Sequence, residues 1–362
     1  MAGQSDQQRA RVLSGMRPTG SLHLGHYVGA LENWVRLQDQ YDCFFFVADW
    51  HALTTDYADT SKVKQNSLDM VLDWLACGLD PQKATLFIQS HVMEHAELHL
   101  LLSLITPLGW LERVPTYKEQ RENIKDKDLG TYGFLGYPVL QAADILIYQA
   151  GYVPVGEDQV PHVELTREVA RRFNQFYPRA ATASATAASG PPAATVRPVL
   201  PEPQPLLTPA AKLPGTDGRK MSKSYDNSLL LTDPEPVIRQ KLKTMVTDPA
   251  RIRRNDPGNP DICPVGDLHK IFSGPQTIEK VSSGCKSAGI GCIECKKWVA
   301  DGILQVLLPI QERRRKYEEN PRLAWDILES GSAAARKVAA STMQEVRAAM
   351  HLSQEYEPPA KG

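Results

Sequence analysis

The sequence predicts an α/β protein with a doubly wound parallel sheet, followed by a mainly helical C-terminal part. Between residues 11 and 177, short apolar runs alternate with longer stretches in which apolar residues recur every three or four positions. That alternation is typical of strands and helices that take turns along the chain. Beyond Pro236 the helical pattern dominates. Ligands of such sheets bind beyond the carboxyl ends of the strands.

Composition excludes several classes of protein. The chain has 362 residues, of which 42% are hydrophobic and 23% charged, so it can bury a core and is not wholly disordered. No run reaches the eighteen or so apolar residues of a membrane span, and the polar N-terminus lacks a secretory signal. We therefore expect a soluble cytoplasmic protein without a membrane partner. From Val237 onward Lys and Arg outnumber Asp and Glu, 20 to 15, which favours contact of this part with a polyanion.

The expected elements follow the chain in order. Apolar runs predict strands, and apolar residues at helical spacing predict the helices between them. The expected strands are 12–13, 43–47 and 85–88, and the expected helices are 26–40 and 61–77. Further helices are expected at 238–245, 298–317 and 321–350, the last of them rich in alanine.

The sequence also predicts where one part of the chain ends and the next begins. Residues 180–195 contain only Ala, Thr, Ser, Gly and Pro, and Pro-rich sequence follows them. Such a stretch buries too little area to offset its ordering entropy. We therefore expect a catalytic domain over 1–178, an Ala/Pro-rich insertion or linker over 179–210, a mobile loop over 211–235 and a helical domain over 236–362.

A loop that contains two histidines lies between the first strand and the first helix. Because the free amides at a helix N-terminus attract anions, this is a suitable place for phosphate. Gly25 allows a ligand to approach the backbone, and His23 and His26 are spaced to face one ligand. Neither G-x-G-x-x-G nor a Walker A motif is present. The histidine pair alone is more typical of an ordinary loop.

A second loop, residues 214–224, contains two lysines between glycines and serines. Lys220 and Lys223 can donate to phosphate oxygens as point charges, and the glycines would let the loop close over a triphosphate. By itself, this sequence is more typical of a solvated basic turn.

Together the two loops resemble the signature pair of the class I aminoacyl-tRNA synthetases. The motifs are H-L-G-H at residues 23–26 and K-M-S-K-S at residues 220–224. Within that class, the sequence is most similar to the bacterial tryptophanyl-tRNA synthetases, over residues 20–31, 48–53, 137–148, 153–167 and 213–231. The resemblance implies a Rossmann-like catalytic domain, a C-terminal anticodon-binding domain and a homodimer. It also implies activation of L-tryptophan by ATP with Mg²⁺, followed by transfer to tRNA(Trp).

The resemblance assigns a nucleotide site to the two loops and to residues 156–158. The expected catalytic residues are His23, His26, Lys220 and Lys223. The expected ATP-binding residues are Arg17, Pro18, Thr19, Gly25, His26, Gly156, Glu157, Asp158, Leu213, Lys220, Met221, Ser222, Lys223 and Ser224. An ionised amino-acid carboxylate needs no strong base to attack the α-phosphate, so positioning and charge neutralisation would supply the catalysis.

The resemblance also assigns a tryptophan pocket around Asp144. A carboxylate on an apolar helix needs a donor, and an indole offers one N–H and no acceptor. The expected pocket residues are Leu13, His51, Tyr137, Gln141, Asp144, Val153 and Gln159, the last of them for the ammonium group. Without the resemblance, Asp144 would be assigned to the dipole at a helix N-terminus. A tyrosyl-tRNA ligase is the alternative enzyme, but the apolar Leu13 stands where those enzymes have a tyrosine that bonds the phenol.

Four cysteines near the C-terminus predict a metal site. Cys263, Cys285, Cys292 and Cys295 are separated by 21, 6 and 2 residues. Four thiolates suit either zinc or an iron–sulfur cluster, and spacing alone does not separate them. Some bacterial tryptophanyl enzymes carry a [4Fe–4S] cluster on a similar pattern with one more residue in the long gap, so the resemblance favours the cluster, with Zn²⁺ as the alternative. Another class of function is a tRNA-binding iron–sulfur regulatory protein without activation activity.

Overall fold

The computed structural model describes residues 9–123, 128–179, 198–208 and 213–352. The strands are β1 (Arg11–Met16), β2 (Asp42–Val47), β3 (Ala84–Ile88), β4 (Tyr152–Val155) and β5 (Gln204–Leu207). They form one parallel sheet in the order β3–β2–β1–β4–β5. The chain therefore winds outward in one direction from β1 to β3 and in the other from β4 to β5. This confirms the doubly wound fold and places the change of direction between β1 and β4.

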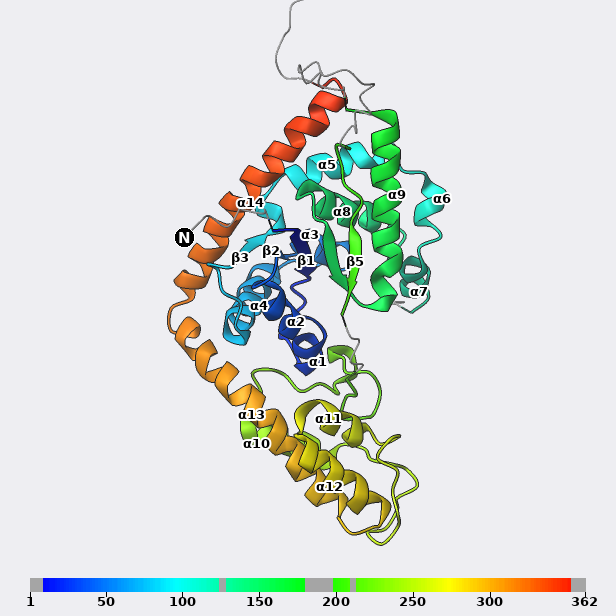
Figure 1. The fold of residues 1–362 in the computed structure, drawn as a ribbon, viewed down its shortest axis with the longest axis vertical. Helices are drawn as coiled ribbons and strands as arrows, with labels where there is room; N and C mark the ends of the chain where they lie inside the picture. Colours follow the sequence, from blue (N-terminus) through cyan, green and yellow to red (C-terminus); the bar gives the residue numbers. More distant parts are fainter. Residues whose placement is uncertain (1–8, 124–127, 180–197, 209–212, 353–362) are drawn as a thin grey trace, which may run out of the picture.

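Helices cover both faces of this sheet (Figure 1). In chain order the helical segments are α1 (Leu24–His26), η1 (Tyr27–Leu31), α2 (Glu32–Leu37), α3 (Asp49–Asp56), α4 (Val63–Cys77), η2 (Gln89–His91), α5 (Glu94–Ser103), α6 (Leu108–Leu111), α7 (Pro115–Asn123), α8 (Tyr132–Ile147), η3 (Glu157–Gln159), α9 (Val160–Phe176), η4 (Lys223–Tyr225), α10 (Glu235–Thr244), α11 (Pro264–Phe272), α12 (Pro275–Lys286), α13 (Cys292–Glu318) and α14 (Pro321–Ala349). None of them, in the part of the chain that is described, is long and apolar enough to cross a membrane.

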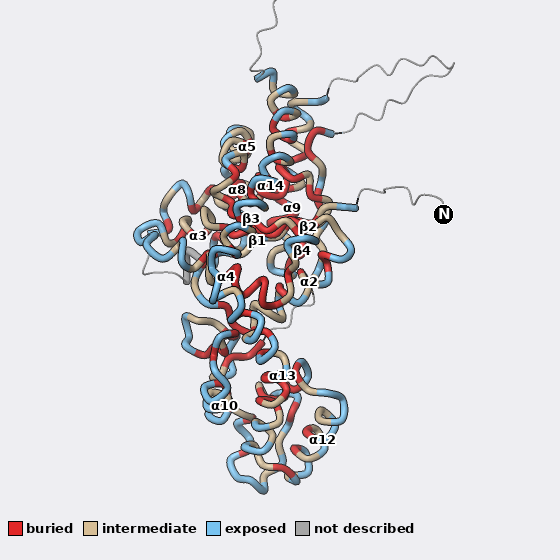
Figure 2. The backbone as a smooth tube through the Cα atoms, turned by 90° about the vertical axis from the view of Figure 1, so that its left-hand side faces the viewer, coloured by how far each residue is buried: buried red, intermediate tan, exposed pale blue. Residues whose placement is uncertain are grey.

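Alternation along β2 divides the interior into two cores. Cys43, Phe45 and Val47 point into one core, which α2 and α4 cover, whereas Phe44 and Phe46 point into the other, under α5, α8 and α9. Successive side chains of a strand face opposite sides of the sheet, so a strand buried on both sides reads as a continuous apolar run. Figure 2 shows this pattern as buried backbone along the strands and along the inner sides of the flanking helices.

The C-terminal part continues the first core beyond the sheet. α13 packs against α4 and carries α10 and α11, so Ile238, Leu268 and Ile303 join the core of α2 and α4. Arg314 fixes this junction: its Nε donates to Asp73 on α4 at 2.7 Å, and both residues are buried. Arg314 is therefore part of the packed junction rather than an exposed surface cation.

Helix α14 departs from the expected division of the chain. We expected residues 321–350 to belong to the helical C-terminal domain, but α14 runs back along the edge strand β3 and contacts α4, α5 and α8 (Figure 1). The hydroxyl of Ser332 accepts a hydrogen bond from the backbone N–H of Ile88. An exposed strand edge can pair with other chains, and here a helix covers it.

Strand β5 overturns part of the expected linker. We expected residues 179–210 to be an insertion or linker, yet Gln204–Leu207 pair in register with Tyr152–Val155 of β4. Val199 and Leu200, just before the strand, are buried in the second core. The expectation of a linker is therefore wrong for residues 198–208. The proline in β5 is tolerated because this strand lies at the edge of the sheet. Residues 180–197 lie outside the described part of the chain.

Replacing Gly331 by alanine is expected to destabilise the protein. A Cβ atom at this position would overlap the carbonyl oxygen of Leu86, because α14 crosses β3 in close contact there. Since both partners are backbone, the helix has to move away from the sheet, and overpacking of this kind costs about 1–3 kcal/mol. The free energy of unfolding in urea measures the effect. Gly133→Ala is the matched control, because Gly133 also lies in a helix and no atom lies near the Cβ that alanine would add. The stability of this variant should be unchanged or slightly higher.

Candidate active site

A cavity of about 400 Å³ opens beyond the carboxyl ends of β1 and β4. Its walls include the end of β1, the segment after β4 and one side of α8. All seven side chains expected in the amino-acid pocket line it: Leu13, His51, Tyr137, Gln141, Asp144, Val153 and Gln159. The direction in which the chain winds reverses between β1 and β4. The connections that follow these two strands therefore lead to opposite sides, and a crevice remains between the strand ends.

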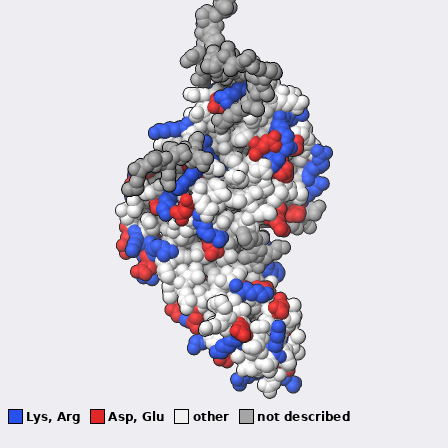
Figure 3. All heavy atoms as spheres, viewed as in Figure 1, with Lys and Arg blue, Asp and Glu red and all other residues white. Residues whose placement is uncertain are grey.

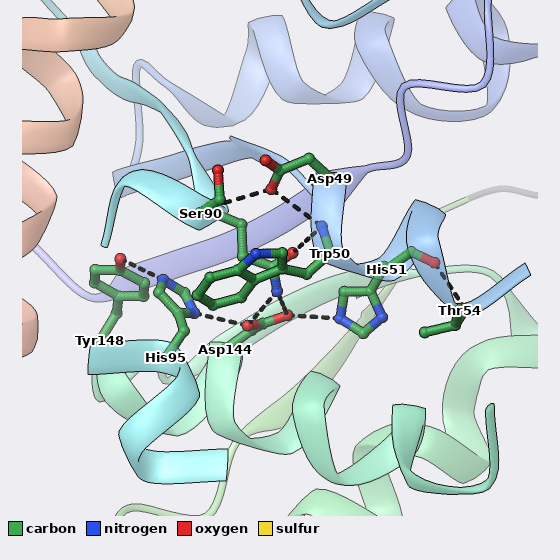
Figure 4. A network of polar contacts seen from close by, with 9 residues as sticks. Asp49, Trp50, His51, Thr54, Ser90, His95, Asp144 and Tyr148 are labelled. Atoms are coloured by element: carbon green, nitrogen blue, oxygen red, sulfur yellow. Dashed lines mark hydrogen bonds and ion pairs between the residues drawn. The ribbon is translucent and has the colours of Figure 1, made fainter. Parts of the chain in front are cut away.

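Asp144 lies at the centre of a buried polar network at one end of the cavity (Figure 4). Its carboxylate accepts hydrogen bonds from His51 Nε2 at 2.8 Å and from His95 Nδ1 at 2.6 Å. The side-chain amide of Gln89 donates to both carboxylate oxygens, at 2.8 and 3.0 Å. His95 is held in turn by the hydroxyl of Tyr148, 2.8 Å from its Nε2. A buried carboxylate needs such donors to remain charged.

These donors keep Asp144 ionised. Burial alone would raise the pKa of Asp144, but the hydrogen bonds from His51 and His95 outweigh it and lower the pKa to about 2. Of the partners, only His51 also lines the cavity. Sequence reasoning missed Gln89, His95 and Tyr148. Gln89 follows β3 and His95 lies on α5. That both meet Asp144 follows from the position of β3 beside β2 in the sheet, and no local sequence pattern indicates it.

A second polar group lies beside Tyr137 in the cavity wall. The hydroxyl of Thr116 is 2.6 Å from both the hydroxyl of Tyr137 and Nε2 of His162. Burial lowers the pKa of His162 to about 4 and raises that of Tyr137. Thr116 and His162 were also missed. The helix that carries Tyr137 begins at Tyr132, where the side chain of Thr131 caps it.

The two histidines of the first loop form a reciprocal cap at the start of α1. Nδ1 of His23 accepts the backbone N–H of Gly25, and Nδ1 of His26 accepts the backbone N–H of His23, both at 3.1 Å. The rings lie 3.9 Å apart. A Cβ at Gly25 would approach the His23 ring to 2.8 Å, so this position needs glycine for the histidine itself. With Nδ1 accepting, each neutral ring carries its proton on Nε2 and presents it as a donor.

Both imidazoles are neutral near pH 7. Burial lowers the pKa of His23 to about 4, and the charges of Lys223 and Lys220 add to this effect. Burial likewise lowers the pKa of His26 to about 3, with further contributions from His23 and Lys223. The two rings can therefore donate hydrogen bonds to an anion, but they add no positive charge to it.

The lysine loop lies against the histidine loop. Nζ of Lys223 donates to the backbone oxygen of Thr19 at 2.7 Å, and burial lowers its pKa. Lys220 is exposed but near enough to His23 to affect its pKa. The segment after the lysines bonds back to the first loop, through Leu24 N–H to Leu229 O at 2.9 Å and Leu231 N–H to Leu22 O at 3.0 Å. The structure thus brings the four expected catalytic side chains together.

Asn227, which sequence reasoning missed, shapes the lysine loop. Its Nδ2 donates to Asp217 at 2.7 Å and to the carbonyl of Lys220 at 3.2 Å, while its Oδ1 accepts from the N–H of Ser222 at 2.8 Å. The side chain is almost fully buried. These bonds span the loop from residue 217 to residue 222 and fix its backbone.

The other expected nucleotide residues surround the cavity mouth without all lining it. Arg17 and Gly156 line the cavity, and Glu157 and Asp158 are exposed on η3, directly after β4. Pro18 is buried and Thr19 exposed in the first loop. In the second loop Leu213 and Met221 are buried in the core, so they support the loop rather than face a ligand, while Ser222 caps η4 by accepting from the N–H of Ser224.

The four clustered cysteines approach one another at the far end of the C-terminal part. Cys263 precedes α11, Cys285 lies near the end of α12, and Cys292 and Cys295 form the first turn of α13. Burial and, to a smaller extent, the three other thiols raise the pKa of Cys295 to about 12. Among the described residues, however, no group of three or more His, Cys, Asp or Glu side chains has the arrangement of a metal-ion site.

Basic and acidic side chains are mixed on the surface around these cysteines (Figure 3). Lys270 pairs with Asp267 at 2.9 Å and Lys286 with Asp261 at 3.9 Å. Nζ of Lys280 lies 3.9 Å from the ring centroid of Trp298. The positive charges of Lys270 and Lys286 are thus partly neutralised by neighbouring carboxylates.

The two imidazoles of the first loop predict how stability depends on pH. A histidine of the unfolded chain titrates near 6.5, whereas the folded pKa values are about 4 and about 3. Between those values the unfolded chain binds more protons, so the free energy of unfolding should be highest above pH 6.5 and fall as the pH falls. Each ring should account for at most about 2 kcal/mol of that loss near pH 5.

Urea unfolding near pH 8 and near pH 5 measures this loss. The comparison is with a variant that carries both His23→Asn and His26→Asn, because asparagine can accept the same backbone N–H without titrating. The variant should lose less stability on acidification than the unaltered protein. Equal losses in the two proteins would contradict the prediction.

Comparisons with known proteins point to one family. Residues 5–307 match the family described as tRNA synthetases class I (W and Y). The chain is 53% identical over 394 aligned residues to the tryptophan–tRNA ligase of Ralstonia nicotianae, covering 95% of this chain and 98% of that one. It is 54% identical over 344 residues to that of Thermotoga maritima, covering 94% and 99%. A crystal structure of tryptophanyl-tRNA synthetase from Campylobacter jejuni, complexed with ADP and tryptophan, is similar with a TM-score of 0.80 and 31% identity over 94% of this chain and 99% of that one.

Proposed function

The chain belongs to the class I tRNA synthetases (W and Y), and from this premise we propose that it is a tryptophan–tRNA ligase. It activates L-tryptophan with ATP to tryptophanyl-adenylate and pyrophosphate, and then transfers the amino acid to tRNA(Trp). The observation that carries this proposal is the identity of more than half of the aligned residues with two tryptophan–tRNA ligases over nearly the whole chain. A cytoplasmic location stays a prediction.

The first step needs positioning more than acid–base chemistry. An oxygen of the ionised tryptophan carboxylate forms a bond to the α-phosphorus of ATP as the bond to the bridging oxygen of pyrophosphate breaks. No proton has to move. Mg²⁺ accompanies ATP and shares the phosphate charge. We assign phosphate donation to Nε2–H of His23 and His26 and to the ammonium groups of Lys220 and Lys223, because these groups converge from two loops.

The second step takes the tryptophanyl group from the adenylate. A hydroxyl of the terminal tRNA ribose attacks the carbonyl carbon, the ester forms, and AMP leaves with the electron pair of the broken bond while the hydroxyl proton is released.

The exposed Glu157 and Asp158, together with Gly156 and Arg17, are the residues we assign to the adenosine side of the cavity mouth. Their position directly after β4 supports that assignment.

We assign the cavity itself to tryptophan. The indole N–H would bond to the carboxylate of Asp144 beside His51, on the side of the network that faces the cavity. A carboxylate has about four lone-pair sites, so an added donor does not require the loss of Gln89 or His95. We assign Gln159 to the ammonium group, and Leu13, Tyr137, Gln141 and Val153 complete the lining.

Amino-acid-dependent exchange between ATP and pyrophosphate tests the function. Tryptophan should support exchange, and tyrosine should support it far less, because the apolar Leu13 cannot bond a phenol hydroxyl. Exchange with tyrosine alone would favour the tyrosyl ligase. If no amino acid of the twenty supported exchange, the chain would be a tRNA-binding protein that lacks activation activity.

We further propose that the four cysteines hold a [4Fe–4S] cluster, with Zn²⁺ as the alternative. Support comes from the approach of four thiols from three helices and from a buried cation beside them. The thiols would have to turn toward one centre, since they do not yet form an ion site. The cluster would cross-link α11, α12 and α13. Protein purified without oxygen should contain equal amounts of iron and acid-labile sulfide. A colourless protein that contains zinc would contradict the cluster.

A homodimer is supported by an apolar surface on α5 and α6. Leu100, Leu104 and Leu108 expose 59%, 72% and 61% of their surface, and the first two lie one helical turn apart. Contiguous exposed apolar side chains mark interaction sites, and we propose a second copy of the chain as the partner. Leu104→Glu should sediment as a monomer, whereas Leu323→Glu, which alters a leucine on α14 with 45% of its surface exposed, should not. Two dimeric variants would contradict this interface.

A further inference from the structure

Arg251 is a buried arginine beside the four cysteines. It lies in the loop between α10 and α11 and exposes only 8% of its surface. One terminal nitrogen, Nη1, is 3.7 Å from Sγ of Cys285. The other, Nη2, donates to the backbone oxygens of Arg254, at 3.1 Å, and of Ile290. The buried Nε has no hydrogen-bond partner within the described residues.

Asp248, the nearest in sequence of this loop's three aspartates, bonds to backbone N–H groups rather than to this guanidinium. Oδ1 of Asp248 accepts the N–H of Ala250 at 2.9 Å, and Oδ2 accepts the N–H of Asn259 at 2.7 Å. No ion pair of Arg251 occurs in the described ranges. The groups that face its charged end are thus two backbone oxygens and a sulfur. A buried charge without a counter-charge is costly. The carboxylate of Asp248, which forms no ion pair with Arg251, offsets only part of that cost.

The loop backbone packs closely around the arginine and the sulfur. A Cβ at Gly258 would lie 2.7 Å from Sγ of Cys285 and 3.1 Å from Cδ of Arg251. The N–H of Gly258 donates to the backbone oxygen of Cys285 at 3.0 Å. The loop therefore packs against both the guanidinium and the thiol at Gly258, where only a residue without a side chain allows this approach.

We propose that Arg251 is the counter-ion of the four-cysteine site. Metal-bound cysteines are thiolates, and four of them leave the occupied site with net negative charge whether it holds the cluster or zinc. Arg251 compensates that charge and donates an N–H to the sulfur of Cys285, so it is a positioning residue of the site. This inference rests on the proposed four-cysteine site.

The inference predicts opposite effects on the loaded and the metal-free protein. Arg251→Met should speed the loss of iron to a chelator by about 10- to 100-fold, the usual effect of removing a partner of a metal ligand. It should also shift the reduction potential of the cluster to a more negative value, since a nearby positive charge favours the reduced form. After the metal is removed, however, Arg251→Met should be at least as stable toward urea as the unaltered protein, because a buried unpaired charge is gone.

Arg253→Met is the matched control, since it removes the same charge two residues away from an exposed position. It should change none of the three measurements, and Arg251→Lys should retain part of the effect. Iron loss and potential equal to those of the control would overturn the role of Arg251 while leaving the cluster in place. Lower stability of metal-free Arg251→Met would show a merely structural arginine and also overturn it. A full-length protein that binds neither iron nor zinc would overturn the four-cysteine proposal and with it this inference.

Discussion

Asp144→Ala is expected to abolish tryptophan activation while ATP still binds. The carboxylate is the acceptor we assign to the indole N–H, and a site built to bond one polar group loses about 10⁴- to 10⁵-fold in kcat/KM when that bond is missing. ATP–pyrophosphate exchange at varied tryptophan concentration measures the loss. ATP binding by calorimetry should be nearly unchanged, because the hydrogen-bond partners of Asp144 are His51, Gln89 and His95, none of which is assigned to the nucleotide.

The same substitution also disturbs the pocket wall, so a second measurement is needed. Removing the carboxylate leaves the donors of His51, Gln89 and His95 unpaired, each at a cost of about 1–3 kcal/mol. Asp144→Asn keeps the shape and one acceptor oxygen. The substrate test is a tryptophan analogue in which sulfur replaces the indole N–H. The unaltered enzyme should strongly prefer tryptophan over this analogue, and Asp144→Ala should not. A preference that survives in the variant would remove Asp144 from the specificity argument.

The sequence predicted the residues that line the cavity better than the network behind Asp144. Leu13, Asp144 and Val153 were recognised because they lie at strand ends or in short motifs that a resemblance can carry. Gln89, His95 and Tyr148 come from three separate elements and meet only because the sheet places the end of β3 beside that of β2. No local pattern encodes that meeting, since each residue is chemically ordinary in its own segment.

The fold shows the same limit at its two edges. β1, β2 and β3 were predicted from apolar runs, but β5 has four residues, one of them proline, in a stretch whose composition indicates a linker. Its partner β4 determines that it is a strand. Likewise, the amphipathic pattern of α14 predicts a helix but not the surface it covers. Only Gly331 and Ser332, where the helix meets β3, reveal that contact.

Lys223→Met is expected to lower the rate of exchange by about 10²- to 10³-fold, or about 2.7–4 kcal/mol of barrier, the effect of losing one donor to a developing oxyanion. The ammonium group donates to the backbone oxygen of Thr19 in the first loop. It has three donors, so it can keep that contact and still bond to phosphate. Methionine preserves the length of the side chain and removes the charge.

The kinetic signature separates catalysis from positioning at Lys223. If the bond to phosphate strengthens in the transition state, kcat and kcat/KM for ATP should fall together, whereas a contact that only holds the loop in place would raise KM and leave kcat unchanged. Lys83→Met is the control, since Lys83 is exposed and paired with Asp39 at 2.8 Å far from both loops. Because His23 and His26 are neutral near pH 7, the positive charge that the protein adds to this site comes from the lysines and Arg17. An unchanged kcat in Lys223→Met would contradict a catalytic role of Lys223 and leave the neutralisation of pyrophosphate to the other cations.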